Sequence, residues 1–339
     1  MRLSGISFLF ALGALLPAFA QSSVGTVSPP PTPDNVAELA AVMVTGVQPG
    51  PGLWRVSRGD HVMWVLGTLS PLPRSMQWTS QDVDQVISES QQVLQPPSVK
   101  FKADVGFLGK LFLLPSAYSA RKNEDGRTLQ QVLPPAAYAR WLVLKKKYIG
   151  DDRGIERWRP LFAAQELYTK ALKANDLSKT GGVQNSIDQI AKRHGVKQVS
   201  TSYHVVIEHP RDALKAFRQS APHDITCFIR TLENVAQDMP AIKARANAWA
   251  TGDLRALREL PDSGRRDACI SAIADAGFAR TLGLEDVQAR QEATWVAAAR
   301  AAMNRNTQTF ATLPMNELLK SGGYLSKLQA EGYAVEAPE

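Results

Sequence analysis

The sequence predicts an α/β protein with a central mixed, largely parallel sheet that is flanked by helices and opens with a β-hairpin. Short apolar segments alternate with helical segments along residues 51–337, a pattern typical of a largely parallel sheet between helices. The first two apolar segments, 53–57 and 62–66, are separated only by residues 58–61, of which 58–60 are expected to form the turn. So short a connection joins antiparallel strands. We therefore expect one antiparallel pair at the start of an otherwise parallel sheet.

The N-terminus has the three parts of a secretory signal peptide. Arg2 precedes the apolar run 6–16, and the small residues Ala18 and Ala20 follow it. The run is short for a retained membrane anchor, and no later segment approaches about 18 apolar residues. We expect residues 1–20 to be removed, residues 21–50 to form a flexible N-terminal segment, and the mature protein to be periplasmic or secreted, without a transmembrane segment.

The charges are interleaved, which excludes a long basic patch. The chain has 39 basic and 32 acidic residues and a formal net charge of +7. The densest basic run, Lys145–Lys147, follows an apolar helical stretch and is more typical of a solvated helix end than of a nucleic-acid surface. We expect no nucleic-acid partner.

The two cysteines, Cys227 and Cys269, favour a disulfide, because an exported protein matures in an oxidising compartment. The alternatives are two buried thiols and a nucleophile. A nucleophilic cysteine needs a base and an electropositive setting. No local sequence pattern marks either cysteine as a nucleophile.

After the hairpin, Gly67 is expected to let the backbone turn where the second strand ends. A helix is expected after Thr79, followed by a short strand at 93–95 that stops at Pro96. The remaining periodic segments predict helices at 107–114 and 129–144, from 160, across 211–260 and at 285–306, and a strand at 198–207. His204 and His209 lie five residues apart on or after that strand, which puts them on opposite faces and does not suit one metal ion.

Several motifs resemble those of the TraB/GumN family. Gly67-Thr68-Leu69-Ser70 matches a Gly-Thr-x-His motif after the first hairpin, with serine in place of histidine. Residues 182–199 match a helix that leads into a strand, and Trp249-Ala-Thr-Gly-Asp matches a Trp-x-x-Gly-Asp motif. Arg305-Asn306 matches an Arg-Asn pair. The C-terminal segment matches a strand, a Gly-x-x-His motif, a helix and Gly-Tyr-x-Val over residues 310–337.

The resemblance implies a metal-dependent hydrolase, with two Gly-x-x-His motifs and carboxylates around a metal. Here the two histidine positions fall on Ser70 and Glu317, and the acidic positions fall on Gln95 and Gln184. A metal that activates water needs about three protein ligands, and neutral serine and glutamine supply no anionic ones. We therefore expect no metal and no cofactor. The expected remnant pocket consists of Gly67, Thr68, Ser70, Gln95, Gln184, Arg305 and Glu317.

Three functions follow from these observations. The favoured hypothesis is an exported pseudoenzyme that acts as a binding or assembly protein for an unidentified protein or polar small ligand. The alternative is an active, metalloprotease-like hydrolase with a rewired site, using Ser70 and Glu317, although no Gly-x-Ser-x-Gly motif surrounds Ser70. The third is a haem carrier, because a distantly similar fold includes haem-binding lipoproteins. No lipidated cysteine and no clear axial-ligand pair support it.

Overall fold

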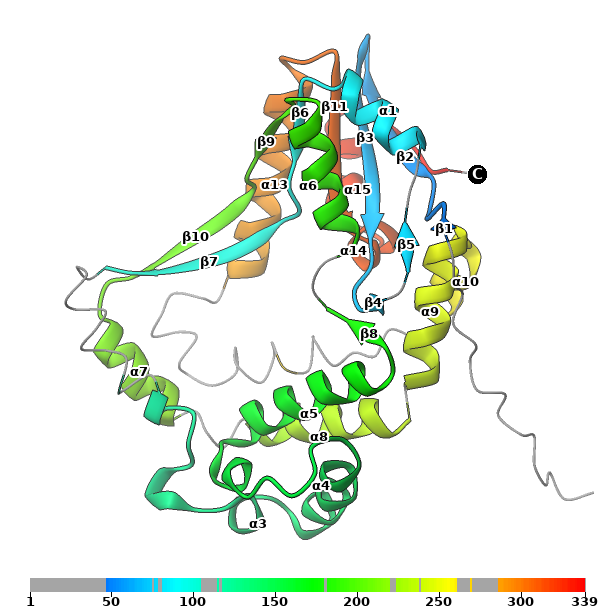
Figure 1. Cartoon of the computed structure of the whole chain (residues 1–339). Helices are drawn as coiled ribbons and strands as arrows, with labels where there is room; N and C mark the ends of the chain where they lie inside the picture. Colours follow the sequence, from blue (N-terminus) through cyan, green and yellow to red (C-terminus); the bar gives the residue numbers. More distant parts are fainter. Residues whose placement is uncertain are drawn as a thin grey trace, which may run out of the picture. The chain divides into compact units, whose positions relative to one another are not determined.

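A computed structural model describes residues 47–74, 76–78, 81–104, 115, 118–179, 182–219, 224–237, 239–260, 269 and 286–338 (Figure 1). The expected signal peptide, most of the N-terminal segment 21–50 and the expected helix at 107–114 lie outside these residues. Every described residue belongs to one unit that spans residues 40–339.

A six-stranded mixed sheet organises this unit, with the strand order β12-β2-β3-β11-β6-β9 (Figure 1). The strands β3, β11, β6 and β9 are parallel, and β2 is antiparallel to both of its neighbours. The bounds are β2 Leu53–Arg58, β3 His61–Thr68, β6 Gln92–Leu94, β9 Lys197–Val199, β11 Gln308–Pro314 and β12 Ala334–Glu336. The predicted fold class is therefore confirmed.

The hairpin turns over two residues rather than the expected three. Arg58 pairs with His61 in the ladder, so Gly59 and Asp60 alone form the turn. Gly59 has a φ of +60°, a conformation that costs little only for glycine. The side chains of Met63, Val65 and Leu66 on β3 are fully buried, which places this strand in the centre of the core.

Helices cover both faces of the sheet. On one face lie α1 (Gln81–Glu89) and α6 (Val183–Arg193), which contact each other. On the other lie α13 (Val287–Met303) and α15 (Tyr324–Ala330) (Figure 1). Each helix contributes fully buried apolar side chains to one continuous core: Ile87, Ile187, Ala191, Trp295, Ala299 and Leu328.

The expected strand 198–207 is two strands. Its first part is β9, and its second part, β10 (Ser202–Ile207), leaves the main sheet and pairs with β7 (Ser98–Ala103) as a parallel two-stranded ribbon. The cause lies on the neighbouring chain segment, where Pro96 and Pro97 separate β6 from β7. Proline has no amide hydrogen to donate, so the ladder is interrupted there.

A second core is built mainly from helices. The expected helix 129–144 is divided at Pro134 into α3 (Leu129–Val132) and α4 (Pro135–Tyr148), because proline disfavours a helical backbone conformation in the residue before it. The helices α5 (Pro160–Ala174) and α8 (Asp224–Ala236) pack with α4 around the fully buried rings of Trp141 and Phe228. Arg159, just before α5, makes two 2.8 Å hydrogen bonds to the buried carboxylate of Asp224.

The remaining elements are short or connect these two cores. They are β1 Val47–Gln48, β4 Leu72–Pro73, β5 Gln77–Trp78, β8 Leu177–Ser178, η1 Glu124–Gly126, η2 Gly154–Arg157, α7 Pro210–Gln219, α9 Met239–Thr251, α10 Leu254–Glu259 and α14 Met315–Leu319. None of the helices in the described part of the chain has the length and hydropathy needed to cross a membrane.

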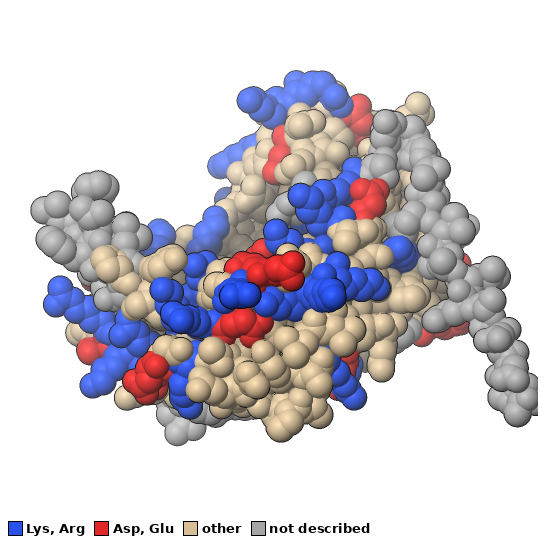
Figure 2. Space-filling model, turned by 60° about the horizontal axis from the view of Figure 1, so that its bottom comes forward, with Lys and Arg blue, Asp and Glu red and all other residues tan. Residues whose placement is uncertain are grey.

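The charged residues are mixed on the surface, as the sequence predicts. On the face shown in Figure 2, Asp and Glu lie among the Lys and Arg side chains, with uncharged areas between them. In the expected basic run, Lys146 and Lys147 are exposed at the end of α4, whereas Lys145 is mostly buried and pairs with Glu156 at 2.8 Å. Cys227 and Cys269, whose Cα atoms are 4.5 Å apart, form the expected disulfide pair.

Candidate functional site

The candidate site lies where the central parallel strands end. Thr68 at the end of β3 pairs with Pro314 at the end of β11, and Leu94 at the end of β6 pairs with Ala311. Ser70, Gln95 and Glu317 therefore follow neighbouring strands at one edge, which we call the carboxyl edge. This is the edge at which open α/β sheets bind ligands.

The first turn of α6 brings Gln184 to the same edge. The helix leads into β9, which is parallel to β6, so α6 must run back along the sheet and begin at the carboxyl edge. Ser70 is also connected to the segment before α6, because its hydroxyl donates a 3.1 Å hydrogen bond to the carbonyl of Lys179. Ser70 and Glu317 share this edge, because they follow the neighbouring parallel strands β3 and β11.

Gly67 has a different role from the expected one. It lies inside β3 and has no positive φ, so it does not serve as a turn. A Cβ atom at this position would overlap the side chain of Met315 and lie 2.9 Å from Cδ1 of Leu318. A Cβ atom here would therefore require the side-chain ends of Met315 and Leu318 on α14 to shift.

The Trp-x-x-Gly-Asp motif supports this end of β3. The indole Nε1 of Trp249 donates a 2.7 Å hydrogen bond to the carbonyl of Gly67, and the Trp249 side chain is fully buried. Gly252 has a φ of +75°, and the carboxylate of Asp253 accepts a hydrogen bond from the amide of Ala256 at the start of α10. The motif thus acts through packing and capping.

The two glutamines at the expected acidic positions are hydrogen-bonded within the protein. The amide of Gln95 donates to Oε1 of Gln198 at 3.2 Å. The amide of Gln184 donates to the carboxylate of Asp188 at 2.9 Å, while its Oε1 is buried without a partner. The second contact joins positions i and i+4 on one helix, a spacing from which it could have been expected. The first joins residues 103 positions apart, for which the sequence carries no signal.

Glu317 and Thr68 are the remaining residues of the expected pocket that lie at this edge. Glu317 lies in the first turn of the short helix α14 and is partly buried. The hydroxyl of Thr68 donates to the carbonyl of Leu313 on β11, at 3.3 Å. The edge thus presents one carboxylate among hydroxyl and amide groups.

Arg305 is not brought to the carboxyl edge. It precedes β11, whose first residue, Gln308, pairs with Val62 near the start of β3. The seven residues of β11 separate it from the candidate site by roughly 20 Å along the strands. Arg305 therefore lies at the opposite end of the sheet, the amino edge.

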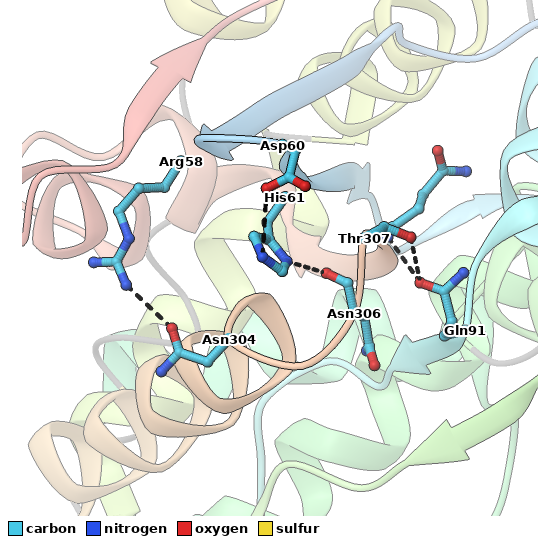
Figure 3. Close-up of polar contacts among 8 residues, drawn as sticks. Arg58, Asp60, His61, Gln91, Asn304, Asn306 and Thr307 are labelled. Carbon is cyan, nitrogen blue, oxygen red and sulfur yellow. Dashed lines mark hydrogen bonds and ion pairs between the residues drawn. The ribbon is translucent and has the colours of Figure 1, made fainter.

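A dense polar network occupies the amino edge (Figure 3). Arg58 donates to the side chain of Asn304 at 3.1 Å, and Nδ1 of His61 lies 2.7 Å from the carbonyl of Asn306. The carboxylate of Asp60 lies 3.6 Å from the other ring nitrogen of His61. The contacts join the hairpin turn to the loop that follows α13.

Gln91, the residue before β6, adds further contacts at this edge (Figure 3). Its Oε1 accepts hydrogen bonds from the amide of Gln308 at 2.8 Å and from the hydroxyl of Thr307 at 3.2 Å. Backbone groups that start a central strand are thereby satisfied.

No group of three or more His, Cys, Asp or Glu side chains in the described ranges could hold a metal ion together. His204 is exposed on β10, and His194 hydrogen-bonds Asp84. Arg290, which the sequence reasoning missed, donates a 3.2 Å hydrogen bond to the hydroxyl of Tyr203 and connects α13 to β10.

The fold and the site define a class: an α/β protein with a mixed sheet, a hairpin that ends in a Gly-Thr motif, and polar residues at the carboxyl edge. The chain belongs to the TraB/PrgY/gumN family, whose family model matches residues 52–337. The resemblance inferred from the motifs is thereby confirmed. Comparisons with curated proteins and with solved structures found no match.

Proposed function

We propose that this family member is exported and acts as a binding or assembly protein without metal-dependent hydrolysis. The observation that carries the proposal is the chemistry of the carboxyl edge. The residues at the expected ligand positions are Ser70, Gln95, Gln184 and Glu317. They include one carboxylate and no imidazole, which does not fit a catalytic zinc site.

Hydrogen bonds within the protein support a role other than metal binding. The hydroxyl of Ser70 and the amides of Gln95 and Gln184 each have a protein acceptor. Hard cations prefer several oxygen ligands at once, whereas Glu317 is the one carboxylate among the residues at the expected ligand positions. A polar ligand that donates a hydrogen bond fits this edge better, because the buried Oε1 of Gln184 lacks a partner.

Metal content and hydrolysis, measured on the same sample, test the proposal. Mature protein is dialysed, its zinc, manganese and cobalt are quantified, and peptide hydrolysis is followed with and without a chelator. We expect less than one metal per chain and no chelator-sensitive activity. One tightly held metal per chain together with hydrolysis that a chelator abolishes would refute the proposal.

A double variant, Ser70→His with Glu317→His, asks whether the two histidines are sufficient. We expect it to stay inactive and to bind no stoichiometric zinc, because Gln95 and Gln184 remain uncharged and the groups that orient metal ligands are not restored. Recovery of zinc-dependent hydrolysis would show that the rest of the site is intact.

The second candidate is a rewired hydrolase, favoured by the placement of Ser70 and Glu317 at one edge. A nucleophilic serine needs a base within hydrogen-bond reach. The hydroxyl of Ser70 instead donates to the carbonyl of Lys179. Labelling with a fluorophosphonate probe separates the two functions: we expect no adduct at Ser70, and an adduct that disappears in Ser70→Ala would favour the hydrolase.

Export is tested by the N-terminus of the mature protein. Cleavage after Ala20 predicts that sequencing begins at Gln21. An intact Met1 in a membrane fraction would contradict export with cleavage.

A further inference from the structure

The main sheet ends on a long edge that is open in the described part of the chain. β9 is the last strand of the six, and β10 continues it while pairing only with β7. The carbonyl of Val199 accepts a 2.9 Å hydrogen bond from the amide of Gln95, and the carbonyl of Ile207 accepts one from Asp104. The backbone groups of these odd-numbered residues thus face β6 and β7.

The even-numbered residues face the other way. Along a strand, the N–H and C=O groups of successive residues point to opposite sides. The backbone groups of Gln198, Ser202, His204 and Val206 therefore point away from β6 and β7, toward the open side, where the amide of Ser202 donates a 3.4 Å hydrogen bond to the hydroxyl of Ser200. We call residues 197–207 the β9–β10 edge. Such an edge is a template for pairing with another strand.

A groove runs beside this edge, between it and α6. It is shallow and widely open, with a volume of about 520 Å³, and it is lined by Asp188, Gln189, Ala191, Lys192, Gly195, Val196 and Gln198. The side chain of Gln198 lies on the same side of the sheet as α6, because its amide donates to the backbone carbonyl of Asp188 on that helix. An added strand would thus place alternate side chains in the groove.

The charges along this edge favour an acidic partner. Lys192 lines the groove and Lys197 is exposed on β9. Lys100 and Lys102 are exposed on β7, beside His204 and Val206 of β10. Opposing carboxylates are fewer: Asp188 accepts a hydrogen bond from Gln184, and Asp104 and Glu208 stand only at the far end of the ribbon.

We propose that the β9–β10 edge binds an extended, acidic segment of a partner polypeptide as an additional strand. The backbone of the segment pairs with the open groups of Gln198 and the residues after it. Alternate apolar side chains enter the groove beside α6, and acidic side chains lie against Lys197. This mode of recognition takes affinity from main-chain hydrogen bonds and specificity from alternate side chains.

The inference does not depend on the chemistry of the carboxyl edge. The two surfaces are nevertheless connected, because Gln95 contacts Gln198 and Gln184 contacts Asp188. Failure of one proposal leaves the other standing, since binding at the β9–β10 edge and metal-dependent hydrolysis are measured separately.

The test uses two fluorescein-labelled peptides and purified mature protein. One peptide alternates valine with glutamate, and the other alternates valine with lysine. Fluorescence anisotropy is expected to show saturable binding of the first and at least about tenfold weaker binding of the second, because like charges placed next to each other repel. Hydrogen exchange at the amide of Gln198 is expected to slow when the acidic peptide binds.

Two variants locate the binding site. Lys197→Glu is expected to lower the affinity for the acidic peptide about tenfold and to raise the affinity for the basic peptide. Gln189→Trp, at an exposed position that lines the groove, is expected to lower the affinity for both peptides. Lys173→Glu, at an exposed position on α5, is the matched control and should change neither.

Several outcomes would overturn the proposal. Absence of saturable binding, equal affinity for the two peptides, or binding that survives both Lys197→Glu and Gln189→Trp would each do so. Concentration-dependent dimerisation in sedimentation experiments, abolished by Gln189→Trp, would instead assign this edge to a second copy of the chain.

Discussion

The two ends of the central sheet use polar side chains in different ways. At the amino edge, hydrogen bonds join loops to one another, as between Arg58 and Asn304 and between Gln91 and Gln308 (Figure 3). At the carboxyl edge, packing of α14 on Gly67 and one indole hydrogen bond from Trp249 hold the strand.

The difference teaches that a dense polar network does not by itself mark the functional end of a sheet. The amino-edge contacts satisfy backbone groups where strands begin, which any fold must do. Hydrogen bonds also occur at the carboxyl edge, and among the described residues each end has one buried side-chain atom without a partner: Oε1 of Gln184 at the carboxyl edge and Nε2 of Gln92 at the start of β6. Variants at the two ends should therefore affect stability and ligand binding differently.

The largest effect is expected for Trp249→Ala at the carboxyl edge. Removing a fully buried indole leaves a cavity and costs about 3–5 kcal/mol of unfolding free energy. Trp249→Phe keeps most of the ring and loses the hydrogen bond to Gly67, at a cost of about 1–3 kcal/mol. Denaturant unfolding measures both. A loss below about 1 kcal/mol for Trp249→Ala would show that this packing does not hold the strand.

Gly67→Ala is expected to cost about 1–3 kcal/mol through overpacking against α14. Leu318→Ala removes one of the two side chains that the new Cβ would meet, so the double variant should lose less than the sum of the single losses. A double-mutant cycle in denaturant measures this coupling. Strictly additive losses of unfolding free energy would show that contact with Leu318 does not cause the cost of Gly67→Ala.

At the amino edge, Gln91→Ala is expected to cost about 1 kcal/mol, because it removes the acceptor of the Gln308 amide. The same variant should leave binding of the acidic peptide at the β9–β10 edge unchanged. Unfolding and anisotropy measurements together check this separation. A loss of peptide binding at unchanged stability would break the distinction between the two ends.

The smallest expected effect depends on pH and involves Asp84, which joins α1 to the end of α6. Burial raises the pKa of this carboxyl, but hydrogen bonds and charges from Arg193 and His194 outweigh it, so the pKa is lower than its ordinary value of 3.8. A lowered pKa stabilises the fold above the unfolded-state value, and this stabilisation is lost as pH falls through the folded-state value.

Asp84→Asn tests this linkage. At neutral pH the unfolding free energy of the wild type should exceed that of the variant by less than about 1 kcal/mol, because the side chain of Asp84 is 42% exposed. The difference should shrink as pH falls from about 5 to 3. Thermal unfolding across that range measures it, and a difference that grows toward low pH would reverse the assigned sign.

The sequence predicted what depends on local pattern. The hairpin and the helices from Pro160 and before β11 follow from spacing along the chain, and the pairing of the two cysteines follows from their number and the expected export. The division of residues 198–207 into two strands was missed because its cause, Pro96 and Pro97, lies on the partner strand.

The candidate site was predicted in part for the same physical reason. Ser70, Gln95 and Glu317 follow parallel strands, so topology alone brings them to one edge. Arg305 precedes its strand and is therefore carried to the other edge. The contact between Arg290 and Tyr203 joins residues 87 positions apart, which no local pattern reveals.

The packing around Gly67 has a consequence for how such chains are recognised. A small residue that lets a helix pack on a strand serves the fold, independently of any reaction beside it. A search pattern centred on this Gly-Thr pair would therefore report the packing of α14 on β3 and not the chemistry of the residues that follow. The informative position is three residues further on, where this chain carries Ser70.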